Sequence, residues 1–309
     1  MCGRFAIKYN TEDLLSQFGE YNLEISSSDD RIIQHHDEAF NVAPSQRSAV
    51  YKSHAQDLDY MKWGLVPHWI KDLATFKSYS TFNARVESLL ESKIWSGCLG
   101  KKRCVVPVSG YYEWKTSGKN KTPYYVTRND GKLTFLAGMY DYIESENLYT
   151  FTIITNEAPE QLKWLHPRMP VVLEPNSKEW DTWMDKDKIK WFQTELNSVL
   201  KSSFEDKYML AYQVSKNVGK ITSKGESLTK RILMKDKFSF VKKEDNIKQE
   251  DERVPSVKIA IKSETKPEIK ESDKKSKLGF TNSKQLAKPR KRSITDMLQS
   301  SSMLKKQKR

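Results

Sequence analysis

Cysteine is scarce in this chain. Its 309 residues include three cysteines (Cys2, Cys98 and Cys104), and none of them shows the C-x-x-C spacing of common structural zinc motifs. So few cysteines argue against a disulfide framework and are typical of a reducing compartment. We therefore expect no metal and no cofactor, and we expect Cys104, in an apolar segment, to be a small buried hydrophobe.

Long hydrophobic runs are also missing. No stretch approaches the roughly 20 apolar residues that are needed to cross a bilayer. The chain also begins without the basic stretch and apolar run of a signal peptide. These features predict a soluble intracellular protein with no membrane partner.

The last quarter of the chain lacks Trp and Tyr, and Lys, Glu and Ser dominate it. Such a segment cannot bury enough apolar surface to offset its conformational entropy. We therefore predict a folded domain over residues 1–235 and a disordered tail over residues 236–309. The tail holds 21 basic and 11 acidic residues, a net of +10, which leaves 32 basic and 29 acidic residues, a net of +3, in the rest. The positive total favours a polyanionic partner such as nucleic acid, but a binding groove in the folded domain must be local.

The domain shows mixed signals for helices and strands. Amphipathic spacing predicts helices at residues 11–18, with Thr11 as the cap, and at 157–164, 177–184 and 188–200. Runs of β-branched and aromatic residues predict strands at 104–108, 124–127, 133–140 and 149–155. The turn at residues 129–131 is expected to join two of these strands as a hairpin. The pattern predicts an α+β domain around a curved, mainly antiparallel sheet. Residues 26–38, with His35 and His36, read as an exposed loop that is not expected to bind metal.

Cys2 directly follows Met1, and methionine aminopeptidase removes Met1 when the second side chain is small. Removal would leave an α-amine and a thiol on the same residue. A 1,2-aminothiol condenses with an aldehyde to a Schiff base, and its thiol then closes a thiazolidine ring. The ring-opened sugar of an abasic site is such an aldehyde within DNA. The alternative interpretation is that Cys2 is merely a small second residue.

Six short segments place polar residues within aromatic-rich, apolar sequence: residues 1–5, 41–45, 63–69, 81–87, 109–114 and 166–170. Their composition and order resemble the SRAP family, the SOS response-associated peptidases, which includes abasic-site processing proteins. The resemblance extends from Met1 to about Gly219 and includes a late segment at residues 214–218. It implies a curved, mainly antiparallel sheet or open barrel with flanking helices.

The resemblance also implies catalytic roles for four residues. Cys2 would capture the ring-opened abasic sugar as a nucleophile. Glu113, whose pKa aromatic neighbours could raise toward neutrality, would handle the amine or thiol proton. His166 would act as general acid in sugar-ring opening, and Asn83 would hold the sugar or the Cys2 backbone. Alternatively, Glu113 is a surface carboxylate and His166 a turn residue.

The same motifs supply candidates for contacts with the DNA strand. Arg4, Arg85 and Arg168 can each clamp a phosphate, although Arg85 can pair with Glu87 instead. The remaining candidates are residues that could stack on bases or wedge between them: Trp63, Trp69 and Pro44. Trp63 lies in a strand-like run, so core packing is its alternative role, and Pro44 alternatively shapes a turn.

These observations predict that the protein is a sensor of abasic sites in single-stranded DNA that crosslinks to them through Cys2. A DNA lyase activity by β-elimination could accompany the capture. One alternative is a thiol peptidase that uses Cys2, Glu113 and His166 and cleaves its own Met1–Cys2 bond. Another alternative is a noncovalent reader of modified DNA bases.

The tail carries weaker signals. Basic clusters at residues 288–292 and 305–309 indicate nuclear import, with cytoplasmic residence or nonspecific phosphate contacts as alternatives. Residues 241–244, 247–250 and 261–264 fit the pattern of SUMO acceptors, so the SUMO or ubiquitin machinery is a candidate partner. Residues 291–298 faintly resemble a sliding-clamp peptide but lack its leading Gln and its aromatic pair.

Overall fold

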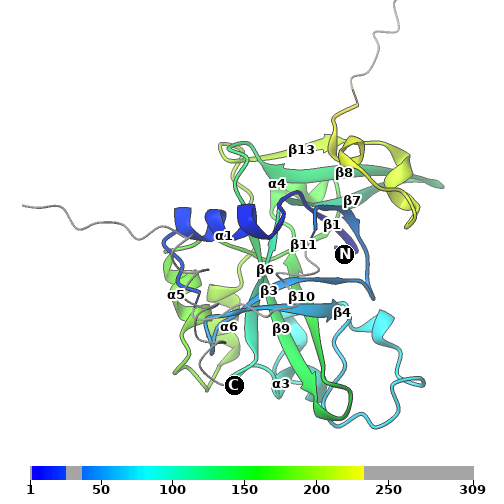
Figure 1. Ribbon diagram of the computed structural model, residues 1–309. Coiled ribbons are helices and arrows are strands. Elements are labelled where there is room, and N and C mark those ends of the chain that lie inside the picture. The colour runs from blue at the N-terminus through cyan, green and yellow to red at the C-terminus, as the bar shows by residue number, and fades with distance from the viewer. Residues whose placement is uncertain (1, 26–36, 233–309) are drawn as a thin grey trace, which may run out of the picture. The chain divides into compact units, whose positions relative to one another are not determined.

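The computed structural model describes residues 2–25 and 37–232, all within one compact unit, Met1–Val241 (Figure 1). Residues 26–36, with His35 and His36, lie outside the described residues. Residues 233–309 lie outside them too. The domain boundary near residue 235 and the motifs of the tail therefore stay predictions.

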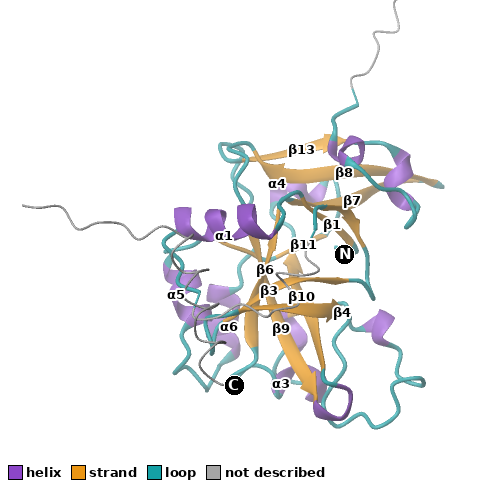
Figure 2. Cartoon of the chain, in the orientation of Figure 1, coloured by secondary structure: helices purple, strands orange, loops and turns teal. Residues whose placement is uncertain are grey.

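The larger of two sheets closes on itself (Figure 2). Its closed part consists of five strands: β3 (Arg47–Lys52), β4 (Leu58–Trp63), β6 (Arg103–Val108), β9 (Thr134–Ile143) and β10 (Leu148–Glu157). Strand β3 pairs with β4 and β6, and β6 pairs with β9. Strand β10 pairs antiparallel with β9 and parallel with β4, which completes the ring. The predicted curved, mainly antiparallel sheet is confirmed, and the pairings close the barrel that the sequence left open.

The carboxyl half of β10 extends past the ring and joins two of the sequence motifs. Strand β5 (Asn83–Arg85) runs parallel to it, and Arg85 lies opposite Thr155. Strand β11 (Arg168–Pro170) runs antiparallel on the same half, and Arg168 lies opposite Glu157. A short strand, β12 (Val172–Leu173), pairs with β9. The segments around Asn83 and Arg168 thus meet through β10, although about 80 residues separate them in the sequence.

The smaller sheet positions the N-terminus. Its strand order is β13 (Met209–Gln213), β8 (Asn120–Arg128), β7 (Gly110–Ser117), β1 (Arg4–Ile7) and β2 (Ala39–Val42). Strands β1 and β7 are antiparallel, with Phe5 opposite Tyr111. A side chain at Gly110 would place its Cβ 2.6 Å from both the Tyr125 ring and the Val126 carbonyl oxygen, so only glycine fits. This close packing holds the start of β7 against β8 and β1.

Short helices flank the sheets: α1 (Thr11–Glu20), α3 (Lys93–Ser96), α4 (Glu160–Lys163), α5 (Lys178–Met184) and α6 (Gln193–Val199). Single 3-10 turns occur at Ser78–Ser80, Val86–Ser88, Glu144–Glu146, Lys216–Gly219 and Glu226–Thr229. Within the described ranges, no helix has the length and apolar character to span a membrane.

Three predicted helix boundaries were wrong. Asn10, rather than Thr11, caps α1, because the Asn10 side chain accepts a hydrogen bond from the Asp13 amide. Helix α4 begins only at Glu160, since β10 continues to Glu157. Helix α6 likewise begins at Gln193, five residues later than predicted. The buried face of α1, Leu14 and Phe18, is as the periodicity indicated.

The predicted hairpin at residues 129–131 was wrong. Gly131 does adopt a positive φ of 75°, as a turn glycine can. The chain then leaves β8 in the smaller sheet for β9 in the larger one. Both edges of β8 are already taken, by β7 and β13. The residues at 129–131 therefore predicted the turn correctly. Because both edges of β8 are occupied, the strand after the turn, β9, pairs in the larger sheet instead.

Candidate active site

Cys2 lies two residues before β1 and is fully buried. Its Sγ lies 3.8 Å from the Arg4 carbonyl oxygen. Burial, and after it the nearby Glu113 carboxylate, raises the pKa of the Cys2 thiol far above its ordinary value. In this state the sulfur is therefore a neutral thiol, and a neighbouring base is needed to activate it.

The β1–β7 pairing brings Glu113 to the same place. Glu113 is almost fully buried, at 5% exposure, and its Oε1 accepts a hydrogen bond of 3.1 Å from the Trp114 amide. It lines one small pocket together with six other residues: Tyr111, Leu162, Leu165, His166, Arg168 and Met169. The structure thus places Cys2 within electrostatic reach of Glu113, and Glu113 and His166 in one pocket. Two of the four predicted catalytic residues thus share a pocket, and a third, Cys2, lies near one of them.

His166 lies in the turn between α4 and β11. Its Nδ1 lies 3.0 Å from the Arg168 amide nitrogen and 2.9 Å from the Arg168 carbonyl oxygen. The amide can only donate and the carbonyl can only accept. The neutral imidazole can therefore accept from the amide, whereas the imidazolium can donate to the carbonyl. The two contacts hold the His166 ring in place at the pocket.

Asn83 is the fourth predicted residue and belongs to β5. Its Nδ2 donates to the Phe82 carbonyl oxygen at 2.9 Å and to that of Ile153 at 3.4 Å. Its Oδ1 is buried and has no hydrogen-bond partner among the residues that the structure describes. Asn83 thus retains an acceptor for a ligand, but no described contact joins it to Cys2, Glu113 or His166.

The partners of Arg85 and Arg168 differ from the prediction. Glu87 forms a bidentate pair with Arg168, at 2.8 and 3.0 Å, rather than with Arg85. Burial is the largest single influence on Glu87 and opposes its ionisation, but the hydrogen bonds from Arg168, a backbone hydrogen bond and the charges of Arg168 and Arg85 together lower the pKa of Glu87. Arg168 also donates to the Thr155 carbonyl oxygen at 2.9 Å. Arg85 is exposed and makes no hydrogen bond or ion pair with the described part of the chain, which leaves its guanidinium available to a phosphate.

Arg4 is committed to the protein itself. Its guanidinium donates to Asn41 Oδ1 at 2.9 Å and to the Val218 carbonyl oxygen at 2.8 Å. Asn41 in turn donates to the carbonyl oxygens of Lys220 and Ser223. In this state the Arg4 guanidinium is therefore occupied within the protein and not available for the predicted phosphate contact. Arg4 instead holds the segment at residues 214–218 against β1.

The two tryptophans predicted to stack on bases have different environments. Trp63 is fully buried against Phe5 and Phe151, which is the core role named as its alternative and leaves no ring face for a base in this state. Its Nε1 donates to the Phe82 carbonyl oxygen at 2.8 Å, which ties the Asn83 segment to the N-terminal strand. Trp69 is 45% exposed and available to a ligand. Pro44 is half-buried in the turn between β2 and β3, as expected from its position.

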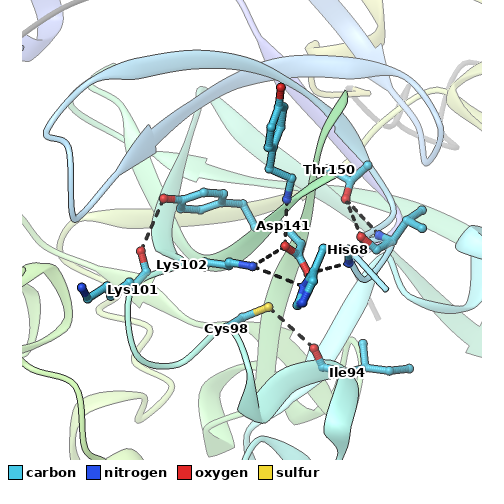
Figure 3. A network of polar contacts seen from close by, with 10 residues as sticks. His68, Ile94, Cys98, Lys101, Lys102, Asp141 and Thr150 are labelled. Carbon is cyan, nitrogen blue, oxygen red and sulfur yellow. Dashed lines mark hydrogen bonds and ion pairs between the residues drawn. The ribbon is translucent and has the colours of Figure 1, made fainter. Parts of the chain in front are cut away.

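A polar network holds the loop that carries Trp69 (Figure 3). The buried Asp141 carboxylate accepts hydrogen bonds from the His68 amide at 2.9 Å and from Lys102 Nζ at 2.5 Å. His68 Nδ1 lies 3.0 Å from the same carboxylate. The His68 ring meets the Trp69 ring edge to face, with centroids 5.0 Å apart. This network fixes the loop after Pro67 and so orients the exposed indole.

Sequence reasoning missed an aromatic and basic surface beside the pocket. Trp164, two residues before His166, is 44% exposed. Its ring meets Tyr124 edge to face at 5.0 Å, and Lys115 Nζ lies 5.1 Å from its centroid. Tyr124 is the cross-strand neighbour of Glu113. The available signal was an unbroken absence of acidic residues from Trp114 to Asn129, which makes the β7–β8 ribbon locally basic.

The other two cysteines, Cys98 and Cys104, do not line the pocket that contains Glu113 and His166. Cys98 and Cys104 are buried, and burial raises the pKa of both thiols, to about 12 for Cys98. Cys104 is therefore the small buried hydrophobe that was expected, and Cys98 is buried in the same way.

The fold and the pocket define a β-rich protein with a thiol, a carboxylate and an imidazole beside its N-terminal strand. The family model described as SOS response associated peptidase (SRAP) matches residues 1–221. The chain belongs to the SRAP family.

Similar proteins carry a common description. The chain is 47% identical over 264 residues to the abasic site processing protein YMR114C of Saccharomyces cerevisiae, covering 79% of this chain and 72% of that protein. It is 35% identical over 230 residues to the abasic site processing protein YoqW of Bacillus subtilis, covering 70% and 92%. A crystal structure of a Bacteroides thetaiotaomicron protein matches with a TM-score of 0.63 and 25% identity, covering 75% of this chain and all of that one.

Proposed function

We propose that this protein captures abasic sites in single-stranded DNA by forming a thiazolidine through Cys2 once Met1 has been removed. The observation that carries the proposal is the convergence of the Cys2 thiol, the Glu113 carboxylate and the His166 imidazole beside the N-terminal strand. The names of the similar yeast and Bacillus proteins support abasic-site processing as the process.

The reaction balances with these three groups. His166 donates a proton to the sugar ring oxygen while the anomeric hydroxyl loses its proton to solvent, from which His166 is reprotonated, and the ring opens to the aldehyde. The Cys2 amine adds to the aldehyde carbon, and the carbinolamine loses water to give an imine. The sulfur then adds to the imine carbon while the thiol proton passes to the nitrogen through Glu113. One aldehyde and one aminothiol yield one thiazolidine and one water.

Burial explains why Glu113 is needed. The Cys2 thiol is protonated in its apolar surroundings, and a thiol is a poor nucleophile compared with its thiolate. A carboxylate within reach can take the proton in the step that forms the carbon–sulfur bond. The same residues could serve a lyase exit by β-elimination, or a peptidase that cleaves the Met1–Cys2 bond, and each is a separate activity to be assayed.

The strand itself would lie across the exposed groups around the pocket. Arg85 supplies an uncommitted guanidinium for a phosphate, and Arg168 can exchange Glu87 for one. Trp69 and Trp164 are exposed rings on which bases can stack. Pro44, in the turn between β2 and β3, is the residue that we propose as a wedge between bases. We further propose nuclear residence, with SUMO or sliding-clamp contacts through the tail, on the sequence motifs alone.

The test is a denaturing gel of tag-free protein incubated with single-stranded DNA that contains one abasic site. We expect a heat-stable shifted band that requires both the lesion and Cys2, so that Cys2→Ala and undamaged DNA give none. Mass spectrometry first verifies that Met1 is absent. If the mature wild-type protein gives no band, covalent capture is refuted, and a noncovalent reader or a peptidase replaces it.

A further inference from the structure

Tyr111 presents an unused hydroxyl to the active-site pocket. Its side chain is almost fully buried, at 1% exposure, and it lines the pocket with Glu113 and His166. Its hydroxyl has no hydrogen-bond partner among the described residues, 2–25 and 37–232. A buried hydroxyl without a partner costs free energy, and among the described side chains with such a hydroxyl Tyr111 is the one that lines this pocket.

The strand geometry explains the position. Side chains alternate along β7, so Tyr111 and Glu113 share one face while Tyr112 lies on the other. Tyr111 belongs to the main core cluster with Cys2, whereas Tyr112 packs in a separate cluster with Tyr125. Burial, then Cys2 and Glu113, raise the pKa of Tyr111 well above its ordinary value. Tyr111 therefore keeps its proton at neutral pH and is a hydrogen-bond donor within electrostatic reach of Cys2 and Glu113.

We propose that the Tyr111 hydroxyl is a further catalytic group, which donates a hydrogen bond to the oxygen of the ring-opened sugar aldehyde and of the carbinolamine formed from it. This inference rests on the proposed covalent capture. The aldehyde oxygen gains negative charge as the amine adds, and a donor already in place stabilises that charge more than it stabilises the substrate. The hydroxyl keeps its proton throughout, so the balance of the reaction is unchanged.

The neighbouring tyrosine provides a matched control. The Tyr112 hydroxyl donates to the Phe40 carbonyl oxygen at 2.7 Å, so it is already satisfied within the protein. Tyr111→Phe removes a hydroxyl that has no partner, whereas Tyr112→Phe removes one that has. The two substitutions are chemically identical and adjacent, but they should act in opposite ways.

The experiment measures the thermal midpoint Tm and the rate of crosslinking to an abasic oligonucleotide for the wild type and both variants. We expect Y111F to crosslink at least tenfold more slowly with an unchanged or higher Tm, and Y112F to crosslink at the wild-type rate with a lower Tm. Borohydride quenching at short times, which reduces the imine to a stable amine, should show the Y111F delay already at imine formation.

Two results would overturn the role of Tyr111. One is a Y111F protein that crosslinks as fast as the wild type. The other is a slow Y111F protein whose Tm has also fallen, with Y112F slowed to the same degree, since both effects would then be structural. A wild-type protein that forms no crosslink instead refutes the proposed function, and with it this assignment.

Discussion

Replacing Glu87 by Gln should strengthen the binding of single-stranded DNA. In the free protein the Glu87 carboxylate occupies the Arg168 guanidinium through two hydrogen bonds of 2.8 and 3.0 Å. A phosphate that binds Arg168 must displace this carboxylate. The side chains of Glu87, Arg168 and the exposed Arg85 together carry a net charge of +1. This net charge becomes +2 in Glu87→Gln. The variant therefore offers one more uncompensated positive charge to the strand.

The size of the effect follows from Coulomb's law. Two unit charges 4 Å apart in water interact by about 1 kcal/mol. The Glu87 side chain is half exposed, so the value for water applies, and the affinity should rise about fivefold at low salt. One more neutralised phosphate steepens the dependence of log K on log salt by about 0.7 for single strands. Between about 50 and 200 mM salt, the advantage should therefore shrink by roughly 2.5-fold.

Fluorescence anisotropy of a labelled, undamaged single strand across a salt series measures both quantities without the covalent step. Glu146→Gln is the matched control, because Glu146 is exposed and precedes the opposite end of β10. It should leave the affinity nearly unchanged. If Glu87→Gln binds no more tightly than the wild type, or shows the same salt slope, Arg168 does not contact a phosphate.

Two other predictions concern the exposed rings and the buried thiols. Trp69→Ala and Trp164→Ala should each weaken single-strand binding by about 5- to 150-fold in anisotropy, the equivalent of roughly 1–3 kcal/mol of base stacking, with no loss of Tm; equal affinity would remove that ring from the strand path. Trp63→Ala should instead lower Tm, because it empties a core site. Burial raises the pKa of the Cys2 thiol, so the folded protein keeps the thiol proton. The unfolded chain loses it at pH values above the ordinary thiol pKa of 9.0. Stability should therefore be full below about pH 9 and fall above it, by at most about 1.4 kcal/mol per pH unit for each such group. Urea melts at several pH values should show a shallower fall for Cys2→Ala, and an unchanged slope would contradict a raised thiol pKa.

The errors in the site predictions have a common origin. Trp63 was named for DNA contact because it lies in a motif, yet its strand-like run already allowed the core role that the structure gives it. Glu87 was offered to Arg85, its neighbour in sequence, but β10 brings Arg168 from 81 residues away into a bidentate pair. Arg4 likewise found its partners at Asn41 and Val218. In each case a partner distant in the sequence took up the side chain.

What the sequence determined by itself was local chemistry. It placed a thiol next to an amine that Met1 removal would free, it indicated four of the 13 described strands and the apolar face of α1, and it grouped the six motifs, because composition, periodicity and spacing are properties of short segments. The tertiary structure decided which of these segments meet. It closed the barrel, sent the chain from β8 to β9 in another sheet, and buried Cys2 beside Glu113 and Tyr111. Strand partners compete for a limited number of edges, and pKa values depend on neighbours far away in sequence, so neither could be read before the chain was folded.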